Sequence, residues 1–159
     1  MLEIGCGGGA NIARLLARCP DGQVWGVDYS EASVEKSRDF NAEAIAAKKC
    51  RVARANVQDL PFEGESFDLA TAFETVYFWP DLEEAFTQVF RVLKKGGRFF
   101  ICNEVDGEDP ADYEMEKKVF GLHIYKEQEV RELLAGAGFS EVTTYRDGEK
   151  RWICFIAVK

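Results

Sequence analysis

The chain has 159 residues, of which 47% are hydrophobic and 30% are charged, and this balance is typical of one soluble globular domain. Its 28 acidic side chains outnumber its 20 basic ones, which gives a formal charge of -8 at pH 7. Such a surface repels phosphate backbones and no basic cluster offsets it, so we expect no nucleic-acid partner. Because the sequence contains no apolar run long enough to cross a bilayer and no cleavable signal, we expect a cytoplasmic protein without a membrane span.

Five cysteines are spread along the chain without a CxxC or Cys/His ligand pattern. Their odd number and wide spacing argue against a disulfide framework or a zinc site and favour a reducing compartment. Cys102 and Cys154 lie in apolar strand-like runs, where a free thiol packs as a small hydrophobic side chain. His123, the only histidine, has no second imidazole near it in the sequence, so a structural role is favoured over catalysis.

In the first half of the chain, short apolar segments alternate with helical ones. A glycine cluster after Ile4 opens an amphipathic helix, and Ser30 can cap a second helix that we expect to run to about Lys48. The segment between Asn56 and Ser66 contains proline and glycine and is predicted to be a loop. The apolar segments predict strands at 1–4, 24–28 and 50–55.

The second half begins with a predicted strand at 67–73. Asp81 and Glu84 form a variant capping box for a helix that we expect to close at Gly96-Gly97. Asp147-Gly148 between two apolar runs is a strong hairpin signal. The remaining predicted elements are a strand at 98–103, helices near 113–120 and at 127–135, and strands at 140–146 and 150–158. This order favours an α/β fold with a mostly parallel sheet.

The loop from Gly5 to Gly9 joins the first predicted strand to the first helix. Glycines let a ligand approach the backbone closely, and the free N–H groups of the helix favour a carboxylate or phosphate. Asp28 ends the next strand, where a carboxylate can accept both hydroxyls of a ribose. The same run satisfies GxGxxA, so a nicotinamide or flavin enzyme fits this spacing, and a purely structural turn is a further alternative.

Three other features bear on this choice. Glu3 sits two residues before Gly5, and a buried carboxylate there needs a cation or hydrogen-bond donors. The ammonium and sulfonium of a ligand provide positive charge, whereas a pyrophosphate would be repelled; the alternative is that Glu3 bonds only to nearby backbone. Asn56 follows the third strand, where its amide can accept the amino group of adenine or simply cap a turn. The third feature is an ordered set of later motifs, Ser66-Phe67-Asp68-Leu69, the segment Arg91 to Arg98, and Ala137-Gly138-Phe139.

Together these motifs resemble the class I S-adenosylmethionine-dependent methyltransferases, in particular the branch of small-molecule and ubiquinone-menaquinone biosynthesis enzymes. The resemblance covers nearly the whole chain. It implies a Rossmann-like, doubly wound, mostly parallel seven-stranded sheet with an antiparallel last strand. It further implies a single core domain over residues 1–159.

The resemblance also implies cofactor-binding residues for S-adenosylmethionine, whose product is S-adenosylhomocysteine, and no metal. Asp28 would hold the ribose, Tyr29 would pack against adenine, and Asn56 stands where the family usually has Asp. Val57 would contribute a backbone contact to the adenine. The methionine part would be surrounded by Glu3, Gly5, Cys6 and Gly7 and by the carbonyl of Phe73.

The expected reaction is a direct displacement at the sulfonium methyl, with a small molecule as acceptor. Binding in line can supply much of the acceleration, so a dedicated catalytic residue is not compulsory. Glu74 and Tyr77 follow the fourth strand and are the only candidates for contacting or deprotonating the acceptor. The aromatic side chains around them can form an apolar pocket or belong to the core.

Family members carry helices before the first strand that cover the cofactor and help build the acceptor pocket. We therefore expect an N-terminally truncated domain of low activity, whose uncovered apolar surface favours self-association. Two other functions remain open: an NAD(P)-dependent oxidoreductase, favoured by GxGxxA and Asp28, and a non-catalytic S-adenosylmethionine-binding module.

Overall fold

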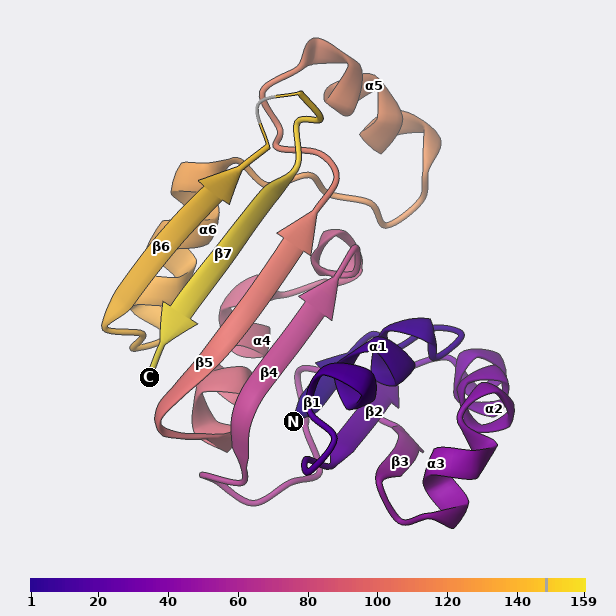
Figure 1. Ribbon diagram of the computed structural model, residues 1–159. Coiled ribbons are helices and arrows are strands. Elements are labelled where there is room, and N and C mark those ends of the chain that lie inside the picture. Colours follow the sequence, from indigo (N-terminus) through magenta and orange to yellow (C-terminus); the bar gives the residue numbers. More distant parts are fainter. Residues whose placement is uncertain (148) are drawn as a thin grey trace.

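The computed structural model describes residues 1–147 and 149–159 (Figure 1). Seven strands form one sheet in the order β3-β2-β1-β4-β5-β7-β6. The pairs from β3 to β5 are parallel, and the last strand, β7, is antiparallel to both of its neighbours. The predicted α/β class and the mostly parallel seven-stranded sheet with an antiparallel last strand are therefore confirmed.

Strands and helices alternate along most of the chain. The strands are β1 (Leu2–Ile4), β2 (Val24–Asp28), β3 (Cys50–Arg54), β4 (Phe67–Phe73), β5 (Leu93–Asn103), β6 (Glu141–Arg146) and β7 (Ile153–Val158). The helices are α1 (Ala10–Arg18), α2 (Glu31–Phe40), α3 (Ala42–Ala46), α4 (Leu82–Val92), α5 (Pro110–Lys118) and α6 (Glu127–Gly136), with a 3-10 turn at Val76–Phe78.

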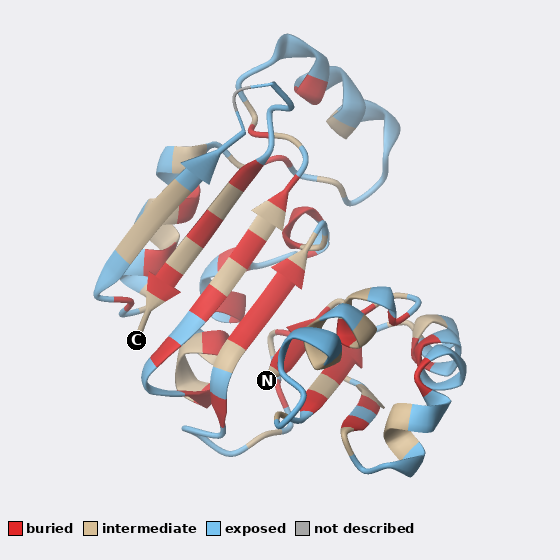
Figure 2. Ribbon diagram, in the orientation of Figure 1, coloured by how far each residue is buried: buried red, intermediate tan, exposed pale blue. Residues whose placement is uncertain are grey.

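Two hydrophobic clusters lie on opposite faces of the sheet. On one face, α1 packs over β1 and β2, and Ile12 approaches the backbone of Gly26 so closely that a larger residue would clash there. On the other face, α4 and α6 cover β4, β5 and β7, as Figures 1 and 2 show. Phe86, Phe99 and Phe155 are fully buried there and form the centre of the larger cluster. The sheet thus has helices on both faces, as a doubly wound fold requires.

The predicted helix from Ser30 to Lys48 is wrong in one respect, because it breaks at Asn41. Ser30 does cap α2 by accepting a hydrogen bond from Ser33 N–H. The buried Asn41 side chain, however, donates to the carbonyls of Gly9 (3.0 Å) and Ser37 (2.9 Å). Asn41 therefore leaves the helix in order to tie α2 to the glycine loop, and the chain restarts as α3.

The predicted end of the next helix at Gly96-Gly97 is also wrong. Asp81 caps α4 as expected, by accepting from Glu84 N–H at 3.1 Å. The helix ends at Val92, because the fully buried Leu93 already pairs with Phe67 as part of β5. Gly96 does adopt a left-handed conformation, but within β5 rather than at the end of a helix.

The last third differs from the prediction mainly at element boundaries. Helix α5 begins at Pro110 rather than near Tyr113, because Asp109 caps the Ala111 N–H and a proline suits the first helical turn. The final two strands pair antiparallel as predicted, but β7 starts at Ile153. Gly148, half of the predicted Asp147-Gly148 turn, lies outside the described residues.

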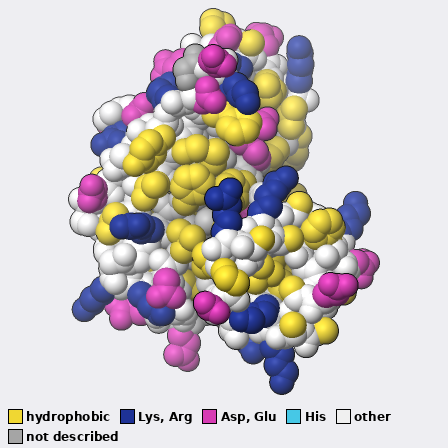
Figure 3. Space-filling model, in the orientation of Figure 1, with side chains coloured by type: hydrophobic (Ala, Val, Ile, Leu, Met, Phe, Trp, Pro, Cys, Tyr) yellow, Lys and Arg dark blue, Asp and Glu magenta, His cyan; other side chains and the backbone are white. Residues whose placement is uncertain are grey.

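One sheet face over β4, β5 and β7 carries no helix in the described part of the chain (Figure 1). Hydrophobic side chains gather on this face in Figure 3. Its half-buried apolar residues include Phe73, Phe100, Cys102, Cys154 and Ile156. Self-association through this face stays a prediction. Among residues 1–147 and 149–159, none of the helices combines the length and hydrophobicity needed to span a bilayer.

Candidate functional site

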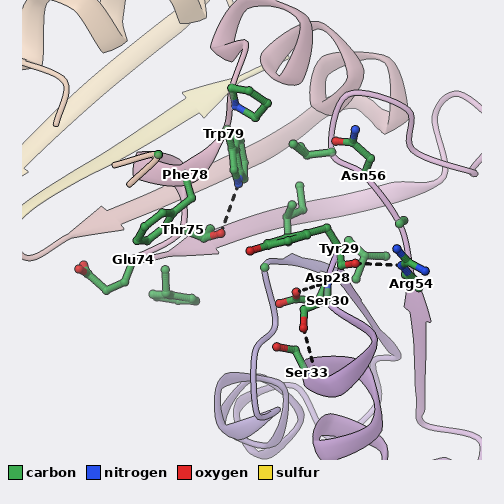
Figure 4. A pocket seen from close by; sticks show the side chains of 18 of the residues that line it. Asp28, Tyr29, Ser30, Ser33, Arg54, Asn56, Glu74, Thr75, Phe78 and Trp79 are labelled. Carbon is green, nitrogen blue, oxygen red and sulfur yellow. Dashed lines mark hydrogen bonds between the residues drawn. The ribbon is translucent and has the colours of Figure 1, made fainter. Parts of the chain in front are cut away.

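A cavity of about 960 Å³ opens at the carboxyl ends of β1, β2, β3 and β4 (Figure 4). The strand order reverses here, because β1 is followed by β2 on one side and by β4 on the other. Ligands of open α/β sheets bind at such a switch point. The lining comes from five segments, Ile4–Gly5, Val27–Ser30 with Ser33, Arg54–Val57, Phe73–Thr75 with Phe78–Pro80, and Phe120–Gly121.

The glycine loop begins at one rim of the cavity, where Gly5 is part of the lining. Gly5, Gly7 and Gly9 all have positive φ angles, which glycine adopts at little cost. A Cβ atom on Gly5 would overlap the Thr75 side chain, whereas Gly7 and Gly8 face open space. Gly5 lines the cavity itself, while Cys6 and Gly7 are not part of its lining. The loop therefore leaves room for a ligand beside its backbone.

These contacts predict opposite outcomes for two neighbouring substitutions. Gly5→Ala should destabilise the fold by about 3 kcal/mol, because it combines a left-handed backbone with a clash against Thr75. Gly8→Ala should be nearly neutral, because nothing lies within 4 Å of its Cβ. Chemical denaturation of both variants measures the difference. Equal stability of the two variants would show that the loop tolerates side chains at Gly5.

Asp28 lies at the end of β2 with its carboxylate held in place by the backbone. Its Oδ2 accepts a hydrogen bond from Gly7 N–H, and its Oδ1 accepts one from Ser30 N–H, both at 2.9 Å. The residue is only 8% exposed, yet it lines the cavity. Each oxygen retains a further lone pair, so the carboxylate can accept two more hydrogen bonds from a ligand.

Glu3 lies beneath α1 and is not part of the cavity lining. The Thr71 hydroxyl donates to Oε2, while Oε1 has no hydrogen-bond partner among the described residues. Burial raises the pKa of Glu3 to about 8, although Thr71 and Asn11 oppose the shift. The carboxyl group is therefore mostly neutral at pH 7, and the predicted contact between Glu3 and a cationic ligand stays a prediction.

Tyr29, Asn56 and Val57 all line the same cavity (Figure 4). The Tyr29 side chain is 75% exposed, and Figure 4 shows its hydroxyl end directed toward Thr75. The Asn56 Oδ1 accepts a bond from Gln58 N–H at 3.0 Å, which fixes the amide at the end of β3. The structure thus brings these predicted contact residues to one site.

The two candidates for an acceptor-side base lie in different surroundings. Glu74 lines the cavity and has a left-handed backbone with φ 57°, a strained conformation for a residue with a side chain. Partial burial, and then the charge of Glu104, raise the pKa of Glu74 to about 7. Tyr77 is buried, accepts a bond from Val105 N–H at 3.2 Å and is not part of the lining. Burial also raises the pKa of Tyr77 above its usual value.

Several lining residues were not singled out from the sequence. Arg54 is paired with Asp28 in the sheet and donates to the Tyr29 carbonyl at 2.9 Å. Its position at the end of a predicted strand was a signal in the sequence that could have identified it as a lining residue. Phe120 and Gly121 had no such signal. They reach the cavity because the segment after α5 folds back, with His123 N–H donating to the Tyr77 carbonyl at 2.8 Å.

Comparisons with known proteins agree with this geometry. Residues 2–101 match the family model described as a methyltransferase domain. The O-methyltransferase cnsE of Penicillium expansum is 31% identical over 152 residues, which cover 92% of this chain and 55% of that protein. The 27-O-demethylrifamycin SV methyltransferase of Amycolatopsis mediterranei is 32% identical over 114 residues, which cover 72% of this chain and 42% of that protein.

A solved SAM-dependent methyltransferase from Thermotoga maritima has the same fold, with a TM-score of 0.75 and 27% identity over 99% of this chain and 81% of that one. The chain spans 27% to 62% of the length of the curated relatives that it matches. The family match nevertheless extends over more than half of the chain and includes the glycine loop, Asp28 and Asn56. The chain therefore belongs to the class I S-adenosylmethionine-dependent methyltransferases.

Proposed function

We propose that residues 1–159 form one S-adenosylmethionine-binding domain that catalyses methyl transfer to a small-molecule acceptor by direct displacement. The observation that carries the proposal is the cavity at the strand-order switch, with Gly5 of the glycine loop at one rim and Asp28 in its lining. The names of the relatives, which include O- and C-methyltransferases, support an acceptor of small size.

The residues present fit this cofactor. The cavity volume of about 960 Å³ accommodates a nucleoside with an amino-acid tail. The free lone pairs of Asp28 can accept the two ribose hydroxyls, and the exposed Tyr29 ring offers a flat surface for adenine. Gly5 and the open space above Gly7 leave room for the methionine part.

The same residues disfavour the oxidoreductase alternative. In a dinucleotide site the glycine-loop N–H groups meet the pyrophosphate. Here the Gly7 N–H is already engaged by Asp28. The described lining contains two carboxylates, Asp28 and Glu74, and one basic side chain, Arg54. This lining would repel a diphosphate and attract a sulfonium.

When bound, the cofactor supplies an electrophilic methyl group on a positively charged sulfur. The protein's part is to hold the acceptor in line and exclude water, for which Phe78 and Trp79 provide an apolar wall. Glu74 is the side chain best placed to take a proton from an acceptor. Its pKa of about 7 suits a general base that works near neutral pH.

Calorimetric titration with S-adenosylmethionine, S-adenosylhomocysteine and NADH tests the proposal. We expect saturable binding of the first two compounds and none of NADH. Saturation by NADH alone would favour the oxidoreductase. A second assay incubates the chain with methyl-labelled cofactor and a metabolite extract; binding without any labelled product would favour the non-catalytic module.

A further inference from the structure

Two cysteines that lie 52 residues apart in the sequence meet on the helix-free sheet face. Cys102 of β5 is paired with Cys154 of β7, and their Sγ atoms are 2.7 Å apart. Both are free thiols. This distance is shorter than an ordinary contact between two sulfur atoms, and only a small movement would bring it to the length of an S–S bond.

The backbone pattern places this pair where side chains approach most closely. The Lys159 N–H donates to the Gly97 carbonyl, so these two residues form a hydrogen-bonded pair. From there hydrogen-bonded and non-hydrogen-bonded pairs alternate along β5 and β7, and the fifth pair after it, Cys102 with Cys154, is of the second kind. A second observation agrees with this. The Asp147 N–H donates to the Trp152 carbonyl, so Trp152 and then every second residue of β7, including Cys154, point their backbone groups toward β6 rather than β5. Cys102 and Cys154 are therefore a non-hydrogen-bonded pair, the kind whose Cα atoms are closer together.

Small molecules can reach the pair. Both residues are only partly buried. Cys102 also lines a second cavity of about 550 Å³ between α1 and the open sheet face. Cys6 and Cys50, in contrast, are buried in the cluster on the other half of the sheet.

We propose that Cys102 and Cys154 form a redox-active dithiol that a low-molecular-weight disulfide, such as oxidised glutathione, converts into a cross-strand disulfide. One protein thiol loses its proton and attacks the oxidant, which gives a mixed disulfide and releases one reduced thiol. The second protein thiol then loses its proton and attacks the mixed disulfide at the protein sulfur. The net change oxidises two protein thiols to one disulfide and reduces one small disulfide to two thiols.

The position of the pair links it to the candidate site. Cys102 is paired with Phe73 across β4 and β5, and its carbonyl accepts the Glu74 N–H at 3.0 Å. Burial raises the pKa of Cys102 well above its usual value, so this thiol stays protonated near neutral pH. Because the thiolate is the attacking form, we expect oxidation to accelerate as the pH rises.

The test uses mass spectrometry on the full chain. The protein is incubated with oxidised glutathione at about pH 8, its free thiols are blocked with N-ethylmaleimide, and it is digested with trypsin without reductant. Cys102 and Cys154 fall in separate tryptic fragments, 99–117 and 152–159. We expect these two fragments to be joined by a disulfide, and we expect the melting temperature to rise by about 5 °C until dithiothreitol is added.

Matched variants distinguish the pair from other thiols. Cys154→Ser should lose both the linked fragments and the rise in melting temperature, whereas Cys50→Ser should keep both. The exposed Cys19 is the internal control, because glutathione attached to it shows that the oxidant was active. If Cys19 carries glutathione while both fragments are recovered unlinked, with N-ethylmaleimide on Cys102 and Cys154, the proposal is overturned. A link between two copies of fragment 99–117 would overturn it as well.

Discussion

Replacing Asp28 with Asn is expected to weaken S-adenosylmethionine binding by about 100-fold, because two charge-assisted hydrogen bonds to the ribose become neutral ones. Isothermal titration with both S-adenosylmethionine and S-adenosylhomocysteine measures the loss. If Asp28 acts through the ribose, the loss should be equal for the two compounds, which share that sugar. If it acts through attraction to the sulfonium, the loss should be larger for S-adenosylmethionine alone.

Asp59→Asn is the matched control for Asp28→Asn. Asp59 is an exposed carboxylate a few residues beyond β3 and is not part of the cavity lining, so its loss should leave both affinities unchanged. Asp28 also accepts bonds from Gly7 and Ser30, so the melting temperature of each variant must be compared with that of the wild type. Unchanged affinity in a folded Asp28→Asn variant would rule out its predicted role.

The sequence was sufficient to predict that certain strand ends come together around the cavity. Asp28 and Asn56 each follow an apolar strand, and the carboxyl ends of parallel strands meet at one edge of the sheet. The glycine loop could be located for the same reason, because its turn is encoded by a few consecutive residues. Local patterns of this kind are readable without knowledge of distant contacts.

Features that depend on distant contacts were not predictable. The break at Asn41 follows from its bond to Gly9, which is 32 residues away. The contact between Cys102 and Cys154 follows from the register of two strands. The contact between the Glu3 carboxyl group and the Thr71 hydroxyl follows from the pairing of β1 with β4, whose residues are 68 positions apart. In each case the partner was invisible in the local sequence.

The burial of Glu3 predicts an unusual dependence of stability on pH. Its pKa is about 8 in the folded chain against an ordinary value of 4.5, so the folded state holds a proton that the unfolded state has released. The stabilising contribution of this proton is fully present below pH 4.5 and is lost as the pH rises through 8. Within that window the free energy of unfolding should fall by about 1.4 kcal/mol per pH unit because of this group.

Glu3→Gln removes the titration while keeping the side-chain size, so the stability of the variant relative to the wild type should increase with pH. Between about pH 5.5 and pH 7.5 the difference in unfolding free energy should change by about 2–3 kcal/mol in favour of the variant, as measured by urea denaturation. Glu35→Gln, at an exposed position on α2, should show no such trend. A constant difference between Glu3→Gln and the wild type would mean that Glu3 is ionised in the folded chain. The buried carboxylate would then need a compensating positive charge or further donors, which the structure does not provide among the described residues.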